Sequence, residues 1–289
     1  MLTRKSGYLA PFDGVAPAAS DQLERLGYAL VPGILEPREI AELSSEVERV
    51  YREFPADGRG TAVRTAEVDE EFRYEMLNRS SLCQTLAGHR ALLDVIEPLL
   101  GEDCHVIANT CWKNPPVGSK GHTPGEQHGG GFWHIDSGPH IPRPDGVSWP
   151  EAIPYPIFAI GVHVYLQDCP LECGPTGVIA GSHTSGQAPP RDRYNDASLS
   201  WNGEKVTPLI AKRGDAALFV SDVWHRRLPS TEGDTGRFFV QFHYGRRDIA
   251  QRLRTTAEVN HLSSEAMERV KGSREAQLLG MHAPRFYDG

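Results

Sequence analysis

The sequence predicts an α+β protein in which N-terminal helices precede an antiparallel β-sandwich or jelly roll. Apolar residues recur at helical spacing in the first hundred residues and with a period of two after residue 104. The 29 Gly and 22 Pro among 289 residues indicate many turns and therefore much β structure. No helix of crossover length is predicted between residues 158 and 244, which argues against a parallel βαβ sheet.

Two segments of the N-terminal part are predicted as helices. The first begins at Pro37, because proline suits a first helical turn, and ends before Pro55. Its apolar positions are Ile40, Leu43, Val47, Val50 and Phe54. The second follows Ser80, which can cap a helix, and ends at Gly101. Its apolar positions are Leu82, Leu86, Leu93, Ile96 and Leu100.

Four short runs rich in Val, Ile, Phe and Tyr are predicted as strands. They cover residues 105–112, 158–166, 216–220 and 238–244. Short strands joined by long Gly- and Pro-containing connections favour antiparallel pairing. We expect one domain over residues 1–289, with a helical layer at about 20–100, a jelly-roll core at about 104–246 and a C-terminal helix and tail at 247–289.

Composition and charge limit the possible partners and locations. The net charge of −8 repels nucleic acids and anionic membrane surfaces. Residues 1–14 contain no apolar run of signal-peptide length, and the uncharged stretch 152–167 is too short to span a membrane. An odd number of cysteines without a CxxC pair indicates buried thiols. We therefore expect a soluble, cytoplasmic protein without a nucleic-acid or membrane partner.

The pair His134-x-Asp136 is the first candidate for a functional site. In an extended segment, residues two apart project from one face, so an imidazole and a carboxylate can bind the same ion. A surface histidine that is hydrogen-bonded to a neighbouring acid would give the same pattern. His128 is a possible rival ligand, because the three glycines after it would let its loop fold back.

Two downstream residues make the metal hypothesis more specific. Residues 214–225 are expected to form a strand that delivers His225, and Arg237 begins another strand. Two histidines and one carboxylate fit the facial triad of non-haem Fe(II) oxygenases, which leaves metal positions open for a 2-oxo acid and O2. A guanidinium can hold the remaining carboxylate of that acid. Strand alternation also places Gln241 and His243 on the face of Arg237.

From residue 21 to residue 245 the sequence resembles the phytanoyl-CoA dioxygenase family of Fe(II)- and 2-oxoglutarate-dependent oxygenases. The resemblance depends on several motifs in a fixed order. They are Gly27-Tyr-x-x-x-Pro-Gly, Lys113-Asn-Pro-Pro, His134-x-Asp136, Glu172-Cys-Gly-Pro-Thr-Gly-Val-Ile-Ala-Gly-Ser-His183, Gly214-Asp215, Trp224-His225 and Arg237 before an aromatic strand.

The resemblance implies a double-stranded β-helix with the N-terminal helices packed on one sheet. It implies that His134, Asp136 and His225 bind Fe(II) and that Arg237 holds the distal carboxylate of 2-oxoglutarate. Further candidates for cosubstrate binding are Gln241, Asn109 and Lys113. Related halogenases have a small residue at the carboxylate position, so Asp136 favours hydroxylation over halogenation.

The function expected from these residues is hydroxylation of a small organic molecule, lipid-like or a secondary metabolite, with O2 consumed and succinate and CO2 released. One alternative is a cupin-like metal enzyme that does not use 2-oxoglutarate. Another is a module that binds a metal or small molecule without turnover. His183 is interpreted as a structural hydrogen-bonding residue, and the loops 137–156 and 184–206 as lids or solvated loops.

Overall fold

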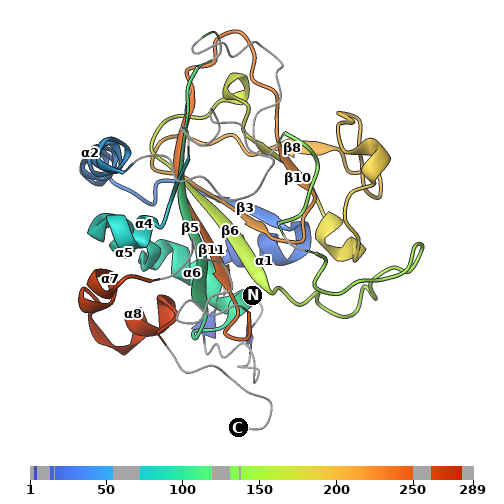
Figure 1. Ribbon diagram of the computed structural model, residues 1–289. Coiled ribbons are helices and arrows are strands. Elements are labelled where there is room, and N and C mark those ends of the chain that lie inside the picture. Colours follow the sequence, from blue (N-terminus) through green and yellow to red (C-terminus); the bar gives the residue numbers. More distant parts are fainter. Residues whose placement is uncertain are drawn as a thin grey trace.

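The computed structural model describes residues 3–4, 14–15, 17–54, 72–116, 118, 131–136, 138–249 and 262–281 (Figure 1). It contains a larger and a smaller antiparallel sheet. Helices α2 and α4 to α8 lie on one side of the larger sheet, and the strands of the smaller sheet lie on the other. This is the arrangement of the predicted jelly roll with helices packed on one sheet.

The larger sheet has six strands in the order β3-β9-β6-β11-β5-β4. Its strands are β3 Tyr28–Val31, β4 Phe72–Tyr74, β5 His105–Asn114, β6 Ala159–Tyr165, β9 Ala216–Val220 and β11 Arg237–Gly245. The smaller sheet has the order β10-β7-β8. Its strands are β7 Thr176–Ile179, β8 Val206–Pro208 and β10 His225–Arg227. A separate pair joins β1 Thr3–Arg4 to β2 Gly14–Val15.

The four predicted strands correspond to β5, β6, β9 and β11, which form the centre of the larger sheet. Strands β3 and β4, which the N-terminal part contributes to the two edges of that sheet, were not predicted. The prediction of a continuous strand over residues 214–225 was wrong. Strand β9 ends at Val220, and β10 begins only at His225, because the chain crosses there from the larger to the smaller sheet.

The helices are α1 Ala18–Leu26, α2 Pro37–Glu53, α4 Met76–Arg79, α5 Ser81–Ala87, α6 Arg90–Leu100, α7 Ser264–Glu268 and α8 Gly272–Leu278. The helix predicted from Pro37 is confirmed as α2. Ser80 caps α5, because its Oγ accepts a hydrogen bond from the Cys83 amide at 3.1 Å. The second predicted helix is in fact two, since Gly88 ends α5 before α6 begins. Leu82 is 38% exposed, because α5 buries Cys83, Leu86 and Ala87 instead, so its predicted place on the apolar side was wrong.

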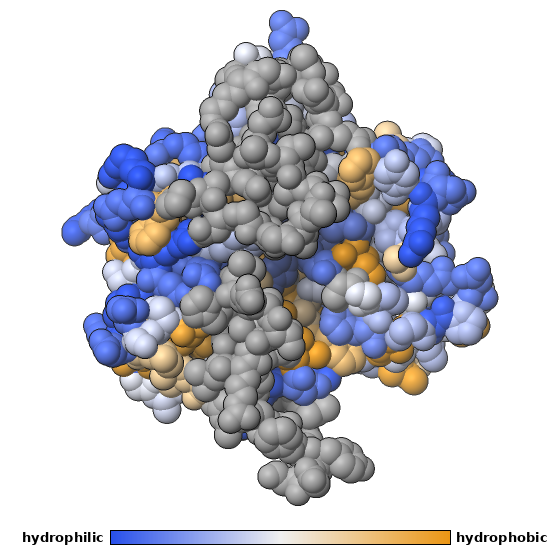
Figure 2. Space-filling view, in the orientation of Figure 1, coloured by the Kyte–Doolittle hydropathy of each residue, from blue (hydrophilic) through white to orange (hydrophobic). Residues whose placement is uncertain are grey.

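The alternation of strand β11 divides the molecule into a core side and a cavity side. Phe238, Val240, Phe242 and Tyr244 join the apolar cluster that includes the helices. The Tyr244 hydroxyl donates to the carbonyl of Ala87 in α5 at 2.8 Å, which attaches this helix to the sheet. The alternate residues of β11 face the smaller sheet. The visible surface in Figure 2 is mostly hydrophilic outside the grey atoms, as expected when the apolar side chains fill such a core.

The sequence predicted buried thiols and no membrane-spanning stretch. All five cysteines are buried and free, as predicted. Within the described ranges, helices are too short or too polar to serve as membrane spans.

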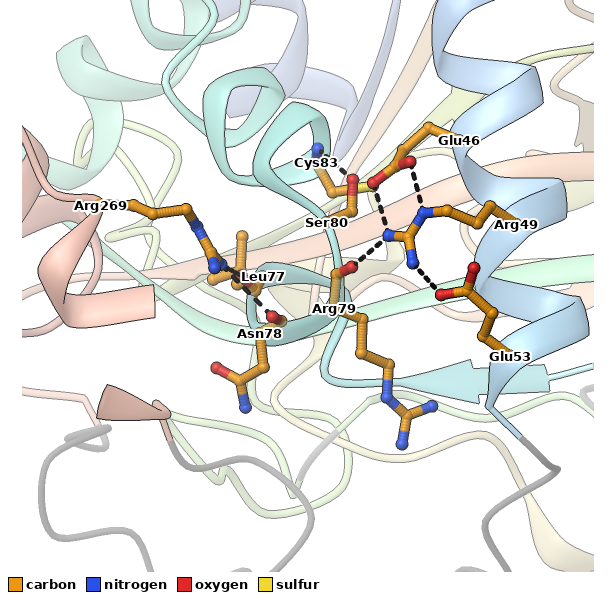
Figure 3. Close-up of polar contacts among 9 residues, drawn as sticks. All are labelled: Glu46, Arg49, Glu53, Leu77, Asn78, Arg79, Ser80, Cys83 and Arg269. Carbon is orange, nitrogen blue, oxygen red and sulfur yellow. Dashed lines mark hydrogen bonds and ion pairs between the residues drawn. The ribbon is translucent and has the colours of Figure 1, made fainter. Parts of the chain in front are cut away.

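Arginine side chains from two other helical segments hold the end of the short helix α4 (Figure 3). Arg269, which follows α7, donates to the carbonyls of Leu77 at 2.6 Å and Asn78 at 3.3 Å. Arg49 of α2 donates to the carbonyl of Arg79 at 2.7 Å and is flanked by two carboxylates of its own helix. The last carbonyls of a helix have no intrahelical partner, so both guanidinium groups satisfy acceptors that would otherwise be open.

We predict that Arg269→Met lowers the free energy of unfolding by about 1.5–3 kcal/mol, because it removes hydrogen bonds from a charged group to partly buried carbonyls at the end of α4. Urea denaturation measures the change. Lys271→Met is the matched control, since Lys271 is an exposed cation two residues away. Equal unfolding midpoints for the two variants would contradict this role of Arg269.

Candidate metal centre and its cavity

A backbone bridge between two distant segments brings the candidate ligands together. His134 and His225 exchange a pair of N–H···O=C hydrogen bonds, each 3.0 Å long, in antiparallel orientation. Their imidazole rings consequently lie 4.2 Å apart, measured between centroids. The amide of Asp136 donates to the carbonyl of Ser221 at 3.1 Å, so the carboxylate is carried to the same place.

The three side chains have the geometry of a metal site. One potential ligand atom from each of His134, Asp136 and His225 lies within 4.8 Å of the other two. The Nδ1 atoms of the histidines contact the carbonyls of Phe132 at 2.7 Å and Val223 at 2.9 Å. A carbonyl only accepts hydrogen bonds, so each Nδ1 carries a hydrogen, and each Nε2 offers its lone pair to a metal when the ring is neutral.

The electrostatics of the cluster suit a cation. Burial, helped by His225, lowers the pKa of His134 to about 4, so this imidazole is neutral near pH 7. Burial alone would raise the pKa of Asp136, but His225 and His243 outweigh it and hold that pKa well below its usual range. Burial alone would likewise lower the pKa of His225, but Asp136 outweighs it and raises that pKa. The cluster thus stabilises a positive charge, which a divalent metal ion supplies when it displaces the proton.

His243 is a member of the site for which the sequence analysis proposed no role. Its Nε2 lies 3.0 Å from Asp136 Oδ2, while Oδ1 lies 3.3 Å from His225 Nε2. One oxygen of the Asp136 carboxylate therefore contacts His243, and the other faces His225. The alternation of residues along the predicted strand from Arg237 could have indicated this role, because it places His243 on the same face as Arg237.

The triad opens into a cavity of about 540 Å³ between the two sheets. The four side chains predicted to share one face of β11 all line it: Arg237, Phe239, Gln241 and His243. Arg227 was not predicted. It lines the cavity because it alternates with His225 on β10, and its backbone pairs with that of Thr176.

Arg237 is a buried cation that faces this cavity. It is 5% exposed, and its donors bind the neutral groups Asn114 Oδ1 at 3.1 Å and the Gly174 carbonyl at 3.3 Å. Its guanidinium lies 4.9 Å from the centre of the Phe239 ring. Among the described residues it has no ion-pair partner. A buried charge without a counterion is costly, so this position favours binding of an anion.

Gln241 is also in the cavity. Its Oε1 accepts hydrogen bonds from Thr110 Oγ1 at 3.0 Å and Trp112 Nε1 at 2.9 Å. Both contacts fix the orientation of the amide. The nitrogen of the amide is consequently the group that a ligand can reach.

The structure does not bring Asn109 and Lys113 to the cavity, and their prediction as cosubstrate-binding residues is corrected. Asn109 Oδ1 accepts from the Leu77 amide at 2.7 Å, and the Lys113 ammonium pairs with Glu48 of α2. Both side chains lie on the side of β5 opposite Thr110 and Trp112, which line the cavity, because alternate residues of a strand project from opposite faces.

The two other histidines singled out in the sequence have different outcomes. His183 Nε2 donates to the carbonyl of Glu24 at 3.0 Å, and burial lowers the pKa of His183 to about 4. This supports the structural interpretation of His183. His128 lies outside the described residues.

A double-stranded β-helix with two histidines and one carboxylate at its cavity is the arrangement of mononuclear non-haem metal proteins, a class that includes the Fe(II) oxygenases. Within that class, the model of the phytanoyl-CoA dioxygenase (PhyH) family matches residues 23–231, and the chain belongs to this family. A search of curated proteins found no match.

Solved structures share the fold at low sequence identity. EctD from S. alaskensis with bound Fe is 20% identical, with a TM-score of 0.61 over 82% of this chain and 78% of that one. The epimerase SnoN in complex with Fe3+, alpha ketoglutarate and nogalamycin RO is 18% identical, with a TM-score of 0.59 over 80% and 83%. HygX from Streptomyces hygroscopicus with nickel and 2-oxoglutarate bound is 16% identical, with a TM-score of 0.56 over 81% and 88%.

We predict that His243→Phe weakens the affinity for Co2+ by about 10- to 100-fold, because the partner that orients a ligating carboxylate is lost. Titration of the cobalt absorption spectrum measures this. His243→Gln should retain part of the affinity. Gln241→Leu is the control, since Gln241 lies on the same face of β11 but is bonded to Thr110 and Trp112. The role of His243 is refuted if both positions give the same loss.

Proposed function

We propose that this protein is an Fe(II)- and 2-oxoglutarate-dependent dioxygenase that hydroxylates a small organic molecule. The observation that carries the proposal is the buried guanidinium of Arg237 in the cavity of the triad. A metal enzyme that binds only its substrate has no need of this second charge. A cosubstrate with a carboxylate at each end requires both a metal ion and a distant cation.

The charges of the described residues fit this cosubstrate. Two neutral imidazoles and the Asp136 carboxylate would leave a divalent ion with a net charge of +1, and Arg237 adds another positive charge. 2-Oxoglutarate is a dianion, so its two carboxylates match the two charged positions. Gln241 can donate a hydrogen bond to the same molecule from its amide nitrogen.

Iron held by His134, Asp136 and His225 would supply the activation of O2, and the protein provides binding, orientation and shielding. Phe219 and Phe239 are both 1% exposed and line the cavity, which limits access of water to the reacting groups. The carboxylate of Asp136 occupies the ligand position that a halogenase would leave to a halide. Hydroxylation is therefore the proposed outcome.

Two further observations support the proposal. The related structures of SnoN and HygX hold 2-oxoglutarate together with a metal ion. The cavity of about 540 Å³ is within the usual range of small-molecule sites. Its mixed apolar and polar lining suits an organic substrate better than a polymer.

Anaerobic reconstitution with Fe(II) and 2-oxoglutarate, followed by exposure to O2, tests the proposed activity. We expect O2 consumption and succinate formation that depend on both additions and increase with active members of a small-molecule panel. Metal binding without measurable 2-oxoglutarate binding would instead favour the cupin-like enzyme. Binding of both without succinate formation would favour a non-catalytic module.

We predict that Arg237→Leu weakens 2-oxoglutarate binding by about two to three orders of magnitude, because one partner of a buried ion pair is removed. Co2+ affinity should change little. Lys113→Leu is the matched control, since it removes a cation from the opposite face of β5. Calorimetry with 2-oxoglutarate measures both variants, and an unchanged affinity in Arg237→Leu would reject the assigned role.

A further inference from the structure

A second imidazole–carboxylate pair, apart from the triad, joins His140, which lines the cavity, to the buried Asp222. Asp222 is 4% exposed, and one of its carboxylate oxygens pairs with Nδ1 of His140. The other oxygen accepts from the backbone amide of His140 at 3.0 Å and from the Tyr155 hydroxyl at 3.2 Å. The His140 ring is stacked on Phe158, with centroids 4.9 Å apart and an interplanar angle of 2°. The imidazole is therefore fixed in position and orientation.

The second nitrogen of His140 is not used by the described part of the protein. His140 lines the metal cavity, its side chain is 16% exposed, and no described residue forms a hydrogen bond with Nε2. A carboxylate accepts hydrogen bonds, so Nδ1 carries the hydrogen when the ring is neutral. Nε2 is then a hydrogen-bond acceptor on a ring that lines the cavity.

The position of this pair links it to the candidate metal centre. Asp222 follows Ser221, whose carbonyl holds the Asp136 amide at 3.1 Å. Ser221 and His140 both line the cavity. His183 differs from His140 in this respect. It is 1% exposed, and its Nε2 donates to the carbonyl of Glu24.

We propose that His140, oriented by Asp222, binds the organic substrate by accepting a hydrogen bond at Nε2 from an alcohol hydroxyl. This deepens the proposed function and rests on it, since the substrate would share the cavity with the metal and 2-oxoglutarate.

A hydroxyl fits this acceptor better than an ammonium group does. Arg227 of β10 and Arg237 of β11 line the same cavity, and the metal would add further positive charge. 2-Oxoglutarate would offset the charges of the metal and Arg237, which leaves Arg227 as the group that disfavours a cationic substrate. A neutral donor keeps the hydrogen bond without that repulsion, so the proposed substrate carries an alcohol hydroxyl.

Two probes with one carbon skeleton test this assignment. Cyclohexanol can donate a hydrogen bond, whereas cyclohexanone can only accept one. Their affinities are measured by ligand-observed NMR on full-length protein loaded with Zn2+ and 2-oxoglutarate. We expect the wild type to prefer cyclohexanol about fivefold, which corresponds to one neutral hydrogen bond.

Three variants separate the acceptor from a structural role. His140→Phe keeps an aromatic ring on Phe158, and the preference should fall to about one. Asp222→Asn places an amide donor at Nδ1, which moves the hydrogen to Nε2, so the preference should shift towards cyclohexanone. Tyr155→Phe is the control, because it removes a different hydrogen bond from Asp222 and should leave the ratio unchanged.

The ratio of the two affinities is the decisive measurement, because misfolding would weaken both probes together. Equal affinities in the wild type, or a preference that survives in His140→Phe, would overturn the inference. Affinity for 2-oxoglutarate is measured in the same samples. If 2-oxoglutarate binds and the probes are not discriminated, only this inference fails. If the wild type binds metal but not 2-oxoglutarate, the proposed function itself fails.

Discussion

The antiparallel bridge between His134 and His225 is the constraint on which the functional site depends. Two backbone hydrogen bonds place both imidazoles side by side, so the ligand geometry is set by the main chain and not by flexible side chains. The neighbouring carbonyls of Phe132 and Val223 then fix the tautomer of each ring. A metal ion would meet donors that are already oriented, which would reduce the entropy lost on binding.

The larger sheet performs two tasks with opposite faces of the same strands. Strand β11 supplies aromatic and aliphatic side chains to the core on one side, and Arg237, Gln241 and His243 to the cavity on the other. Helices α5 and α6 cover the first face, so the cavity face can carry polar groups without loss of the core. Arg237 remains buried on that second face because the smaller sheet closes over it. The position of a residue along a strand therefore decides whether it stabilises the protein or contacts a ligand.

Residues with strong local patterns were predictable from the sequence. The central strands and helix α2 follow from apolar periodicity. His134, Asp136, His225 and Arg237 were predicted as site residues from their types and order, and the structure brings them to one cavity. Strands of three or four residues are too short to show a clear alternation of apolar and polar residues. Strand β4, for example, forms because the neighbouring β5 offers hydrogen-bonding groups. Asn109 and Lys113 were misassigned because a motif records residue types but not the face of the strand. The His140–Asp222 pair joins residues far apart in the chain, so only the fold reveals it.

The edges of the larger sheet have a consequence for how the chain reaches its native state. Tyr28 of β3 pairs with Phe219 of β9. Strand β3 is synthesised early but can pair only after β9 has been synthesised. Such distant pairings raise the contact order, and proteins dominated by them fold slowly. On the ribosome, β3 has no partner until most of the polypeptide has emerged. Until that pairing forms, β3 is an unpaired strand, and such strands are where partly folded chains aggregate.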